Sequence, residues 1–416
     1  MQPFNYREGV LHAEDCACPD LAAEFGTPCY VYSRAAIEAQ WGQFEQALAG
    51  HPHQICYAVK ANGNLAILAL LARLGAGFDI VSGGELARVL RAGGKASQVV
   101  FSGIGKRWDE MAEALAAGIQ CFNVESAEEL ARLHEVAAAA GQAAPLAIRV
   151  NPDVDARTHP YIATGLKDNK FGVDVETALS LYRQAAASAH LRVTGIACHI
   201  GSQLTELEPF AAALERLLAL TDRLAGEGIV LEHIDLGGGL GIRYQDEMPP
   251  TPAAYAETIL RQLGARPYRL MLEPGRAIVG NAGILLTRVE YIKTTAQRRF
   301  LIVDAAMNDL LRPALYQAWH DIVPVQQQVA PAVRTYDVVG PVCETGDCFA
   351  TDRPLAATEG GLLAFHSAGA YGFVMASNYN ARGRPPEILV DGAGAEVVRA
   401  RETIENQLAG ERIPVF

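Results

Sequence analysis

The chain has 416 residues, of which 50% are hydrophobic and 20% are charged, and its net charge is -12 at pH 7. This length predicts two domains of unequal size, and the ordinary residue balance argues against disorder, collagen-like repeats and coiled coils. The acidic charge argues against a nucleic-acid partner, because binding to phosphate backbones normally needs a basic surface. A small molecule is therefore the expected ligand.

The sequence indicates neither a membrane span nor a metal site. Its first residues contain no apolar stretch of the signal-peptide type, and the run 65–72 is far shorter than the roughly 20 residues that cross a bilayer. We therefore expect a cytoplasmic protein that has no membrane partner. The eight cysteines lack the paired spacing of a zinc site, so we expect reduced thiols and no metal.

From about residue 54, short apolar runs alternate with longer helical stretches, a pattern typical of parallel strands joined by helices. Capping boxes, Ser82 with Glu85 and Ser126 with Glu129, mark two helix starts, and a further helix is expected over 210–228. Eight such units favour a (β/α)8 barrel over an open doubly wound sheet. The expected strands cover residues 54–60, 77–82, 98–103, 120–125, 146–151, 193–201, 233–238 and 269–275.

After about residue 283 the pattern changes to strand-like runs with few long helical gaps. These runs cover residues 283–293, 298–304, 336–343, 361–366 and 387–391, and the early run 28–32 is expected to join them as a strand. The predicted fold class is therefore α/β, a TIM-like barrel with a second all-β domain built from the C-terminal part plus the N-terminal strand. The expected division is an N-terminal segment over 1–34, a barrel over 35–283 and a β domain over 284–416.

In such barrels the active site lies at the carboxyl ends of the strands, and the loops after strands seven and eight often bind phosphate. Strand seven is followed by Gly237–Gly241, whose glycines allow backbone N–H groups to approach a phosphate closely. Strand eight is followed by Glu273–Arg276, which adds a carboxylate and a guanidinium. Strand one ends in Lys60, and a lysine at a barrel mouth is costly unless it is paired or used covalently, for instance in a Schiff base.

Each of these features also has an ordinary structural explanation. The run Gly237–Gly241 is no dinucleotide fingerprint, and a tight turn explains it equally well. Taken alone, Lys60 would be a solvated surface lysine, His199 a core histidine and Cys343 a buried small side chain. The stretch Gly105–Arg107 is no P-loop, because it lacks the required serine or threonine. The combination must therefore carry the argument.

Six short motifs follow one another in register along nearly the whole chain. They are Tyr57–Asn62, His199–Ser202, Gly237–Gly239, Glu273–Arg276, Cys343–Asp347 and Gly369–Gly372. Together they resemble the diaminopimelate decarboxylase family, a pyridoxal-phosphate-dependent family with an alanine-racemase-like barrel. The chain departs mildly from the family pattern, with Thr345 at a usual serine and Ala381–Gly383 at a usual Ser-Arg-Pro.

The resemblance implies that the cofactor is pyridoxal 5'-phosphate and that Lys60 forms the internal aldimine with it. It also implies that His199 stacks on the pyridine ring and that Glu273 pairs with the ring nitrogen, which makes the ring a stronger electron sink. The other cofactor contacts that the resemblance implies are Asp79, Arg149, Ser202, Gly238, Gly239, Gly275, Arg276 and Tyr371.

The implied activity is that of a carboxy-lyase, EC 4.1.1.20, which converts meso-2,6-diaminopimelate to L-lysine and CO2 in the last step of lysine biosynthesis. The reaction would pass through an external aldimine and a quinonoid. The family assigns the returning proton to the cysteine at Cys343, acting across a homodimer interface with shared active sites. Lys60 is an alternative proton donor, and the sequence leaves this choice open.

Substrate choice is predicted from charge, because meso-diaminopimelate keeps a carboxylate and an ammonium at its far end. Arg276, Arg312 and Glu344 would supply the matching charges, and arginine suits bidentate binding of a carboxylate. Tyr316 and Tyr371 would complete the substrate contacts. An ornithine or lysine decarboxylase binds a distal ammonium alone, which an arginine would repel.

Three alternatives to this function stay open. Another decarboxylase of the group, acting on carboxynorspermidine or a basic amino acid, would share the cofactor residues and differ at the substrate set. A racemase needs two opposed bases and gives no reason for the Cys343-Glu344 pair. A catalytically silent pyridoxal-phosphate carrier would tolerate loss of the substrate residues, all of which are present.

Overall fold

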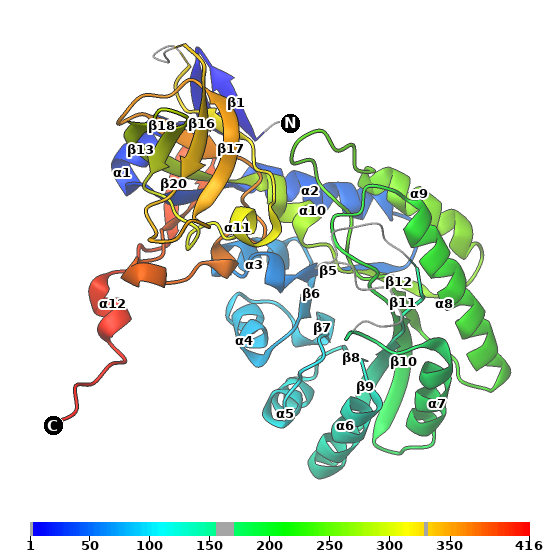
Figure 1. Cartoon of the computed structure of the whole chain (residues 1–416). Coiled ribbons are helices and arrows are strands. Elements are labelled where there is room, and N and C mark those ends of the chain that lie inside the picture. Colours follow the sequence, from blue (N-terminus) through cyan, green and yellow to red (C-terminus); the bar gives the residue numbers. More distant parts are fainter. Residues whose placement is uncertain (1–2, 155–169, 328–331) are drawn as a thin grey trace. The chain divides into compact units, whose positions relative to one another are not determined.

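The computed structural model describes residues 3–154, 170–327 and 332–416 (Figure 1). The chain divides into two compact units. The barrel unit comprises Gln40–Ile242 and Glu247–Ala277, and the β unit comprises Met1–Ala39, Arg243–Asp246 and Ile278–Phe416. No helix within the described ranges has the length and apolar character needed to cross a membrane.

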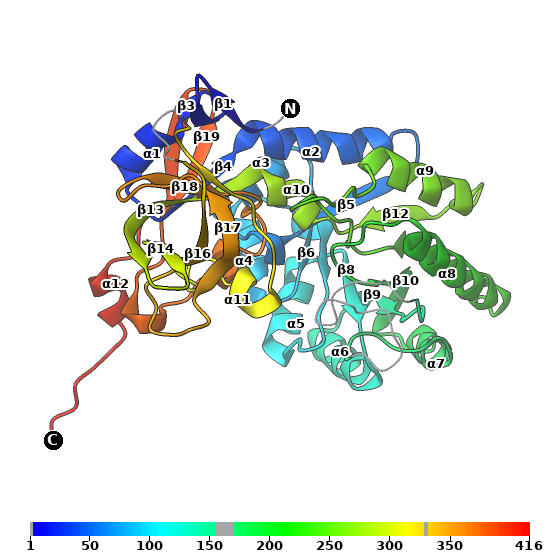
Figure 2. The same cartoon turned by 45° about the horizontal axis from the view of Figure 1, so that its top comes forward.

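Parallel strands close into a barrel at the centre of the barrel unit (Figures 1 and 2). They are hydrogen-bonded in chain order from β5 to β12, and β12 pairs with β5 to close the ring. All eight expected strands are present, so the predicted (β/α)8 barrel is confirmed. The strands are β5 (His53–Ala58), β6 (Gly77–Ile80), β7 (Val99–Phe101), β8 (Cys121–Val124), β9 (Ala144–Arg149), β10 (Leu191–Ala197), β11 (His233–Asp235) and β12 (Arg269–Leu272).

Helices surround the barrel strands (Figure 2). The expected helix over 210–228 is α8 (Glu208–Gly226), which buries Phe210, Leu214 and Leu217 at helical spacing. The other helices of this part of the chain are α2 (Arg34–Ala47), α3 (Leu65–Arg73), α4 (Gly83–Arg91), α5 (Trp108–Ala117), α6 (Ala127–Ala140), α7 (Val175–Ala186) and α9 (Pro252–Leu263). Short 3-10 helices lie at η1 (Val59–Ala61) and η2 (Ala96–Gln98).

The predicted caps of α4 and α6 are present with one difference. The Ser82 hydroxyl accepts a hydrogen bond from the Glu85 N–H at 3.2 Å, but the Glu85 carboxylate accepts from the Val81 N–H at 2.7 Å. In α6 the cap serine likewise binds the third helical residue, whose carboxylate returns to the residue before the cap. The serine half of each box is therefore confirmed, and the glutamate half is displaced by one residue.

Small and sulfur-containing side chains fill a layer inside the barrel. Each of six strands contributes one buried side chain to it, and the set is Cys56, Val100, Cys121, Ala147, Ala197 and Met271. The layer contains no charged group, so it gives the polar residues at the strand ends an apolar floor.

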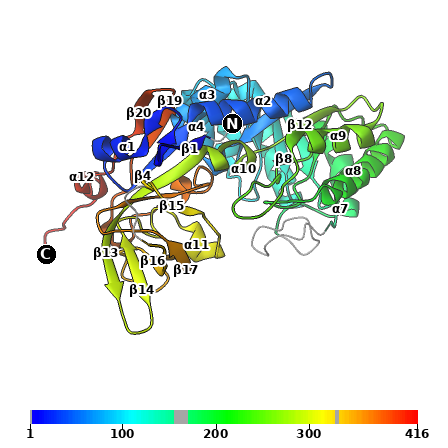
Figure 3. The same ribbon diagram turned by 90° about the horizontal axis from the view of Figure 1, so that it is seen from above.

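The β unit is built around a sheet whose central strands come from both ends of the chain. β4 (Cys29–Ser33) lies between β13 (Gly283–Thr294), to which it is antiparallel, and β19 (Glu387–Asp391), to which it is parallel. The N-terminal strand therefore joins the β domain, as predicted. β13 and β14 (Arg299–Val303) form a long hairpin in Figure 3.

The sheet order is β17-β16-β14-β13-β4-β19-β20, and β18 pairs with β13 and β15. A separate sheet contains β1, β2 and β3. The remaining strands are β1 (Phe4–Arg7), β2 (Val10–Ala13), β3 (Cys16–Ala17), β15 (Ile322–Pro324), β16 (Arg334–Val339), β17 (Cys348–Leu355), β18 (Leu362–Phe365) and β20 (Gly394–Arg399). The remaining helices are α1 (Cys18–Phe25), α10 (Arg276–Val279), α11 (Arg312–Tyr316), α12 (Ile404–Leu408), η4 (Gly280–Ala282), η5 (Phe373–Met375) and η6 (Tyr379–Ala381).

Candidate active site

The carboxyl ends of the barrel strands gather the sequence-predicted cofactor residues of the barrel unit. All barrel strands are parallel, so their carboxyl ends lie at one end of the barrel. Lys60 lies in η1 directly after β5, Arg149 ends β9, and Glu273 follows β12. The other predicted cofactor residues also lie on or after barrel strands. They are Asp79, His199, Ser202, Gly238, Gly239, Gly275 and Arg276.

Lys60 and Asp79 form an ion pair at this end of the barrel. The Asp79 side chain is fully buried, whereas 34% of the Lys60 side chain is exposed. Oδ1 of Asp79 is buried and accepts no hydrogen bond from the residues that the structure describes. Because a buried carboxylate oxygen without a donor is costly, this site favours a ligand that brings a donor or a positive charge.

His199 follows β10 and is held as a neutral ring. The Gly238 N–H donates to its Nδ1 at 3.2 Å, so this nitrogen acts as an acceptor. Burial lowers the pKa of His199 well below its usual value, and the positive charges of Arg149 and Lys60 lower it further. A neutral imidazole is suited to lie against a flat ring without repelling a cation.

The loop after β11 makes a tight cradle beside Glu273. A Cβ atom at Gly238 would lie 2.3 Å from the Glu273 carbonyl oxygen, so glycine is required at this position. Gly239 has a φ of +110°, which also favours glycine. Two side chains of neighbouring loops also meet, because the Arg276 Nη2 after β12 donates to the Ser202 Oγ after β10 at 3.0 Å. Backbone and side-chain donors of this kind are typical of a phosphate site.

Glu273 lies in a network of buried polar side chains. Its Oε1 accepts from the Asn123 Nδ2 at 3.3 Å and from the Ser102 Oγ at 3.4 Å. Burial raises the pKa of Glu273 well above its usual value, and the nearby carboxylates of Asp235 and Asp79 raise it further. Sequence reasoning missed Asn123 and Asp235, although polar residues at the carboxyl ends of β8 and β11 were a usable signal.

A second network supports Arg149. Its Nη1 donates to the Glu125 Oε1 at 3.1 Å, and the N–H groups of Gly103 and Gly172 also donate to this carboxylate. Glu125, which sequence reasoning also missed, therefore joins the ends of β7, β8 and β9. The Arg149 carboxylate partner is buried, so the pair lies in a low-dielectric environment.

Lys106 lies behind these networks and is fully buried. Its Nζ donates to the Gly103 and Asn123 carbonyl oxygens at 2.7 and 2.8 Å and to the Glu129 Oε1 at 2.7 Å. Lys106 belongs to the stretch Gly105–Arg107, which is no P-loop, and it acts as a structural cation that connects the ends of β7 and β8 to α6.

The sequence-predicted substrate residue Arg312 begins α11 in the β unit and is buried. Its guanidinium stacks on the Tyr244 ring at 4.5 Å from the centroid, and its Nη1 lies 2.9 Å from the His320 Nε2. The His320 Nδ1 is 2.8 Å from the His366 carbonyl oxygen, which assigns the ring proton to Nδ1 and leaves Nε2 to accept from Arg312. The guanidinium is therefore fixed in orientation.

Cys343 and Glu344 lie on an exposed loop of the β unit. Asp347 anchors this loop, because its carboxylate accepts from the Val342 N–H at 2.7 Å and from the Met307 N–H at 2.6 Å. The Cys343 N–H donates to the Asn380 Oδ1 at 2.9 Å. Sequence reasoning missed Asn380, whose φ of +58° lies in a region that asparagine tolerates.

The two predicted tyrosines also belong to the β unit. Tyr316 ends α11 and is half-buried. Tyr371 has a φ of +54°, an uncommon conformation for an aromatic residue and typical of functional sites. The structure thus places Arg312, Tyr316, Cys343, Glu344 and Tyr371 in the β unit.

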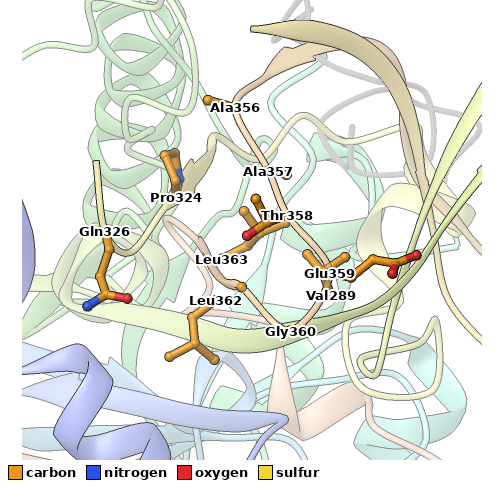
Figure 4. A pocket seen from close by; sticks show the side chains of 11 residues that line it. Val289, Pro324, Gln326, Ala356, Ala357, Thr358, Glu359, Gly360, Leu362 and Leu363 are labelled. Carbon is orange, nitrogen blue, oxygen red and sulfur yellow. The ribbon is translucent and has the colours of Figure 1, made fainter. Parts of the chain in front are cut away.

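A cavity of about 300 Å³ in the β unit is formed by other residues (Figure 4). Its polar side chains include Gln326, Thr358 and Glu359, and none of the residues that line it is a sequence-predicted site residue. The cavity does not coincide with the predicted chemistry.

The barrel-end residues fit a pyridoxal phosphate. Lys60 supplies an amine, the Asp79 Oδ1 a buried acceptor atom without a donor among the described residues, and His199 a neutral ring. The glycine loop and Arg276 provide the donor chemistry that a phosphate requires. The site therefore provides an amine for the cofactor and hydrogen-bond donors for its phosphate.

Comparison with known proteins agrees with this fit. Residues 34–280 match the family model described as pyridoxal-dependent decarboxylase, pyridoxal binding domain. The chain is 61% identical to diaminopimelate decarboxylase of Pseudomonas aeruginosa over 99% of both chains. It is also similar to the structure of diaminopimelate decarboxylase from Helicobacter pylori complexed with L-lysine, with 42% identity, a TM-score of 0.91 and coverage of 94% of this chain and 98% of that one. For the enzyme from M. jannaschii in co-complex with L-lysine, identity is 39%, the TM-score is 0.94, and 99% and 98% of the two chains are covered.

Proposed function

The chain belongs to the diaminopimelate decarboxylase family of pyridoxal-dependent enzymes, and from this membership we propose that it converts meso-2,6-diaminopimelate to L-lysine and CO2. The observation that carries the proposal is the match to curated members of the family over 99% of both chains. The bound L-lysine in two similar structures is the product of this reaction.

Pyridoxal phosphate supplies an electron sink for the negative charge that remains on the α carbon when CO2 leaves. Lys60 would hold the cofactor through its amine, and its ion pair with Asp79 positions Nζ near the ends of β5 and β6. Glu273, a buried carboxyl group, would hold the ring nitrogen, and His199, a neutral imidazole, would lie against the ring.

The loop after β11 would hold the phosphate. Gly238 and Gly239 allow the backbone to approach it closely, and Gly275 lies at the start of the next helical turn. Ser202 and Arg276 add side-chain donors, and their 3.0 Å hydrogen bond shows that they converge. Arg149 supports this end of the barrel from β9 through its bond to Glu125.

Arg312 and Glu344 discriminate the substrate by the charges at its far end. The buried Arg312 guanidinium binds the distal carboxylate, and its stacking on Tyr244 and its bond to His320 fix the orientation needed for two parallel hydrogen bonds. Glu344 pairs with the distal ammonium, while Arg276, Tyr316 and Tyr371 contribute further contacts. A substrate without the distal carboxylate cannot make this bidentate contact with Arg312, so it should bind more weakly.

Cys343 returns the proton to the α carbon in this proposal, and Lys60 is the alternative donor. The Cys343 thiol is exposed in the single chain, which suits a group that completes the site of a second copy. We accordingly propose a cytoplasmic homodimer with shared active sites.

The activity is tested by incubating the protein, loaded with pyridoxal phosphate, with meso-diaminopimelate and measuring CO2 and lysine. We expect equal amounts of both products, and a loss of turnover of roughly 10²- to 10⁴-fold in Lys60→Ala. Lys95→Ala, which changes an exposed lysine of the barrel unit, should retain turnover. Preferred decarboxylation of ornithine, lysine or carboxynorspermidine would replace the proposed substrate by one of the alternatives.

The shared site is tested by mixing Lys60→Ala and Cys343→Ala proteins under conditions of subunit exchange. Each variant alone should be nearly inactive, and mixed dimers should regain one complete site. If mixing restores no activity, sites completed by a second chain are excluded.

A further inference from the structure

Two carboxyl groups lie together at the ends of neighbouring barrel strands. Asp235 is the last residue of β11 and is fully buried, and Glu273 directly follows β12 and is 7% exposed. Asn123 reaches them from β8 across the barrel, with its Nδ2 3.3 Å from the Asp235 Oδ2 and 3.3 Å from the Glu273 Oε1. One amide group therefore connects both carboxyls.

Because one amide nitrogen lies 3.3 Å from an oxygen of each carboxyl, the two groups lie close together in a buried environment of low dielectric. Two neighbouring buried carboxylates repel each other when both are ionised, so the pair favours the state in which one of them keeps a proton. Asp235 already accepts from the Gly237 N–H at 2.8 Å as well as from Asn123. The Gly237 N–H bond to Asp235 is shorter than the 3.4 Å bond that the Ser102 hydroxyl donates to Glu273, so the anion is favoured on Asp235 and the proton on Glu273.

The surroundings of the pair keep this proton in place. Burial is the main cause that raises the pKa of both carboxyls, and Asp79 on β6 raises each of them further. Lys60 on η1 opposes this effect at Glu273. Among the described residues, thiols and a phenol also interact with the pair: Cys56 on β5, Cys121 on β8, Cys198 after β10 and Tyr255 on α9. Burial raises the pKa of each, so they stay uncharged.

We propose that Asp235 is a positioning residue that keeps a proton between Glu273 and the ring nitrogen of the bound cofactor. This inference rests on the proposed function, which places the ring nitrogen against Glu273. Glu273 gives its proton to that nitrogen, so an O–H bond breaks, an N–H bond forms, and Glu273 becomes a carboxylate. The negative charge of Asp235 then favours the protonated ring, with no direct contact between Asp235 and the cofactor.

The test is a pH titration of the holoenzyme loaded with pyridoxal phosphate that carries ¹⁵N in the ring, read by the nitrogen chemical shift. In Asp235→Asn the midpoint for loss of the ring proton should fall by about one pH unit or more, a tenfold change in proton affinity. Asn123→Leu removes a donor from both carboxyls at similar volume, so its midpoint should rise. If Asp235 and Asn123 had a purely structural role, the midpoints of both variants would shift in the same direction.

The matched control is Asp222→Asn, an equal charge change on the exposed side of α8, which should leave the midpoint in place. An unchanged or higher midpoint in Asp235→Asn overturns the proposal. The proposal is also overturned if the cofactor ring of Asp235→Asn stays protonated over the whole pH range in which the wild-type ring is protonated. If Asp235→Asn does not fold, an unchanged or lower midpoint in Asn123→Leu overturns it.

The titration separates this inference from the proposed function. If the wild type forms lysine but neither midpoint moves, the role of Asp235 is wrong and the decarboxylase activity stands. If the midpoints move as expected but no lysine forms, the substrate assignment is wrong and the role of Asp235 stands.

Discussion

The end of the barrel and the Cys343 loop of the β unit hold their polar residues in opposite ways. At the barrel end, Asp235, Glu273 and Asn123 are buried, and the Asn123 amide donates to both carboxyls. In the β unit, Cys343 and Glu344 are exposed, and hydrogen bonds to the backbone hold the loop that carries them. One region fixes charges in a dry interior, and the other presents reactive groups on a supported loop.

This difference separates two tasks. Buried charges interact strongly because the surrounding dielectric is low, so the barrel can set proton affinities before a ligand binds. Exposed groups gain such strength when a ligand or another chain covers them. The barrel is therefore expected to control the electronic chemistry, and the β unit to control substrate choice and the returning proton.

Replacing Lys106 should disrupt the buried hydrogen bonds that support the barrel-end network. Lys106→Met leaves the Glu129 carboxylate and two carbonyl oxygens without their donor, and we expect a loss of about 3–5 kcal/mol in the free energy of unfolding. Urea denaturation measures the change. In the double variant Lys106→Met/Glu129→Leu the uncompensated charge is gone, so part of the stability should return, while the two carbonyl oxygens still lack their donor. A single variant as stable as the wild type would contradict a structural role of the buried pair.

The buried cation of the β unit should behave differently. Arg312→Lys keeps the charge but loses the planar group that stacks on Tyr244 and bonds His320, so the KM for meso-diaminopimelate should rise about 10- to 100-fold. The value of kcat should change much less. Arg334→Lys, at an exposed position of β16, is the matched control. An unchanged KM in Arg312→Lys would remove this residue from the substrate set.

The β unit also has a buried carboxyl group that is sensitive to pH. Burial raises the pKa of Asp309 to about 7 from its ordinary value of 3.8, Asp304 and Asp347 raise it further, and Arg382 opposes them. A raised pKa means that stability is full below pH 3.8 and is lost as the pH rises through 7. Between pH 5 and pH 8, Asp309→Asn should therefore lose about 2–3 kcal/mol less stability than the wild type.

Urea denaturation at both pH values measures this difference. Asp352→Asn removes an exposed carboxylate of the same unit and should follow the wild type. Parallel pH profiles of Asp309→Asn and the wild type would show that Asp309 does not titrate in this range.

The barrel could be predicted because its strands are short apolar runs between amphipathic helices. The predicted strand over 54–60 extended past β5 (His53–Ala58), because Val59 and Ala61 are apolar although they belong to η1. β17 (Cys348–Leu355) was missed, since exposed Thr351 and Asp352 interrupt its apolar pattern. Edge strands with polar faces carry a weak sequence signal.

The candidate site could be predicted where position along a strand was informative. Lys60 and Glu273 follow barrel strands, so they could be placed at its carboxyl end. The contacts of Asn123 with Asp235 and Glu273 could not be predicted, because β8 lies across the barrel from β11 and β12. Such contacts depend on barrel closure, which motifs along the chain do not report.

The smallest effect is expected at the Cys343 loop, where a substitution at Asn380 tests the hydrogen bond that supports the loop backbone. Asn380→Gly removes the acceptor of the Cys343 N–H without strain at a φ of +58°, and one hydrogen bond of about 1 kcal/mol predicts a fall in kcat of roughly fivefold. Asn380→Asp keeps an acceptor oxygen and should retain most of kcat. Cofactor affinity should be the same in both variants, because the barrel unit is unchanged. Equal kcat values for Asn380→Gly and the wild type would mean that the loop is positioned by Asp347 alone, and a loss of cofactor affinity would contradict the division of tasks between the two regions.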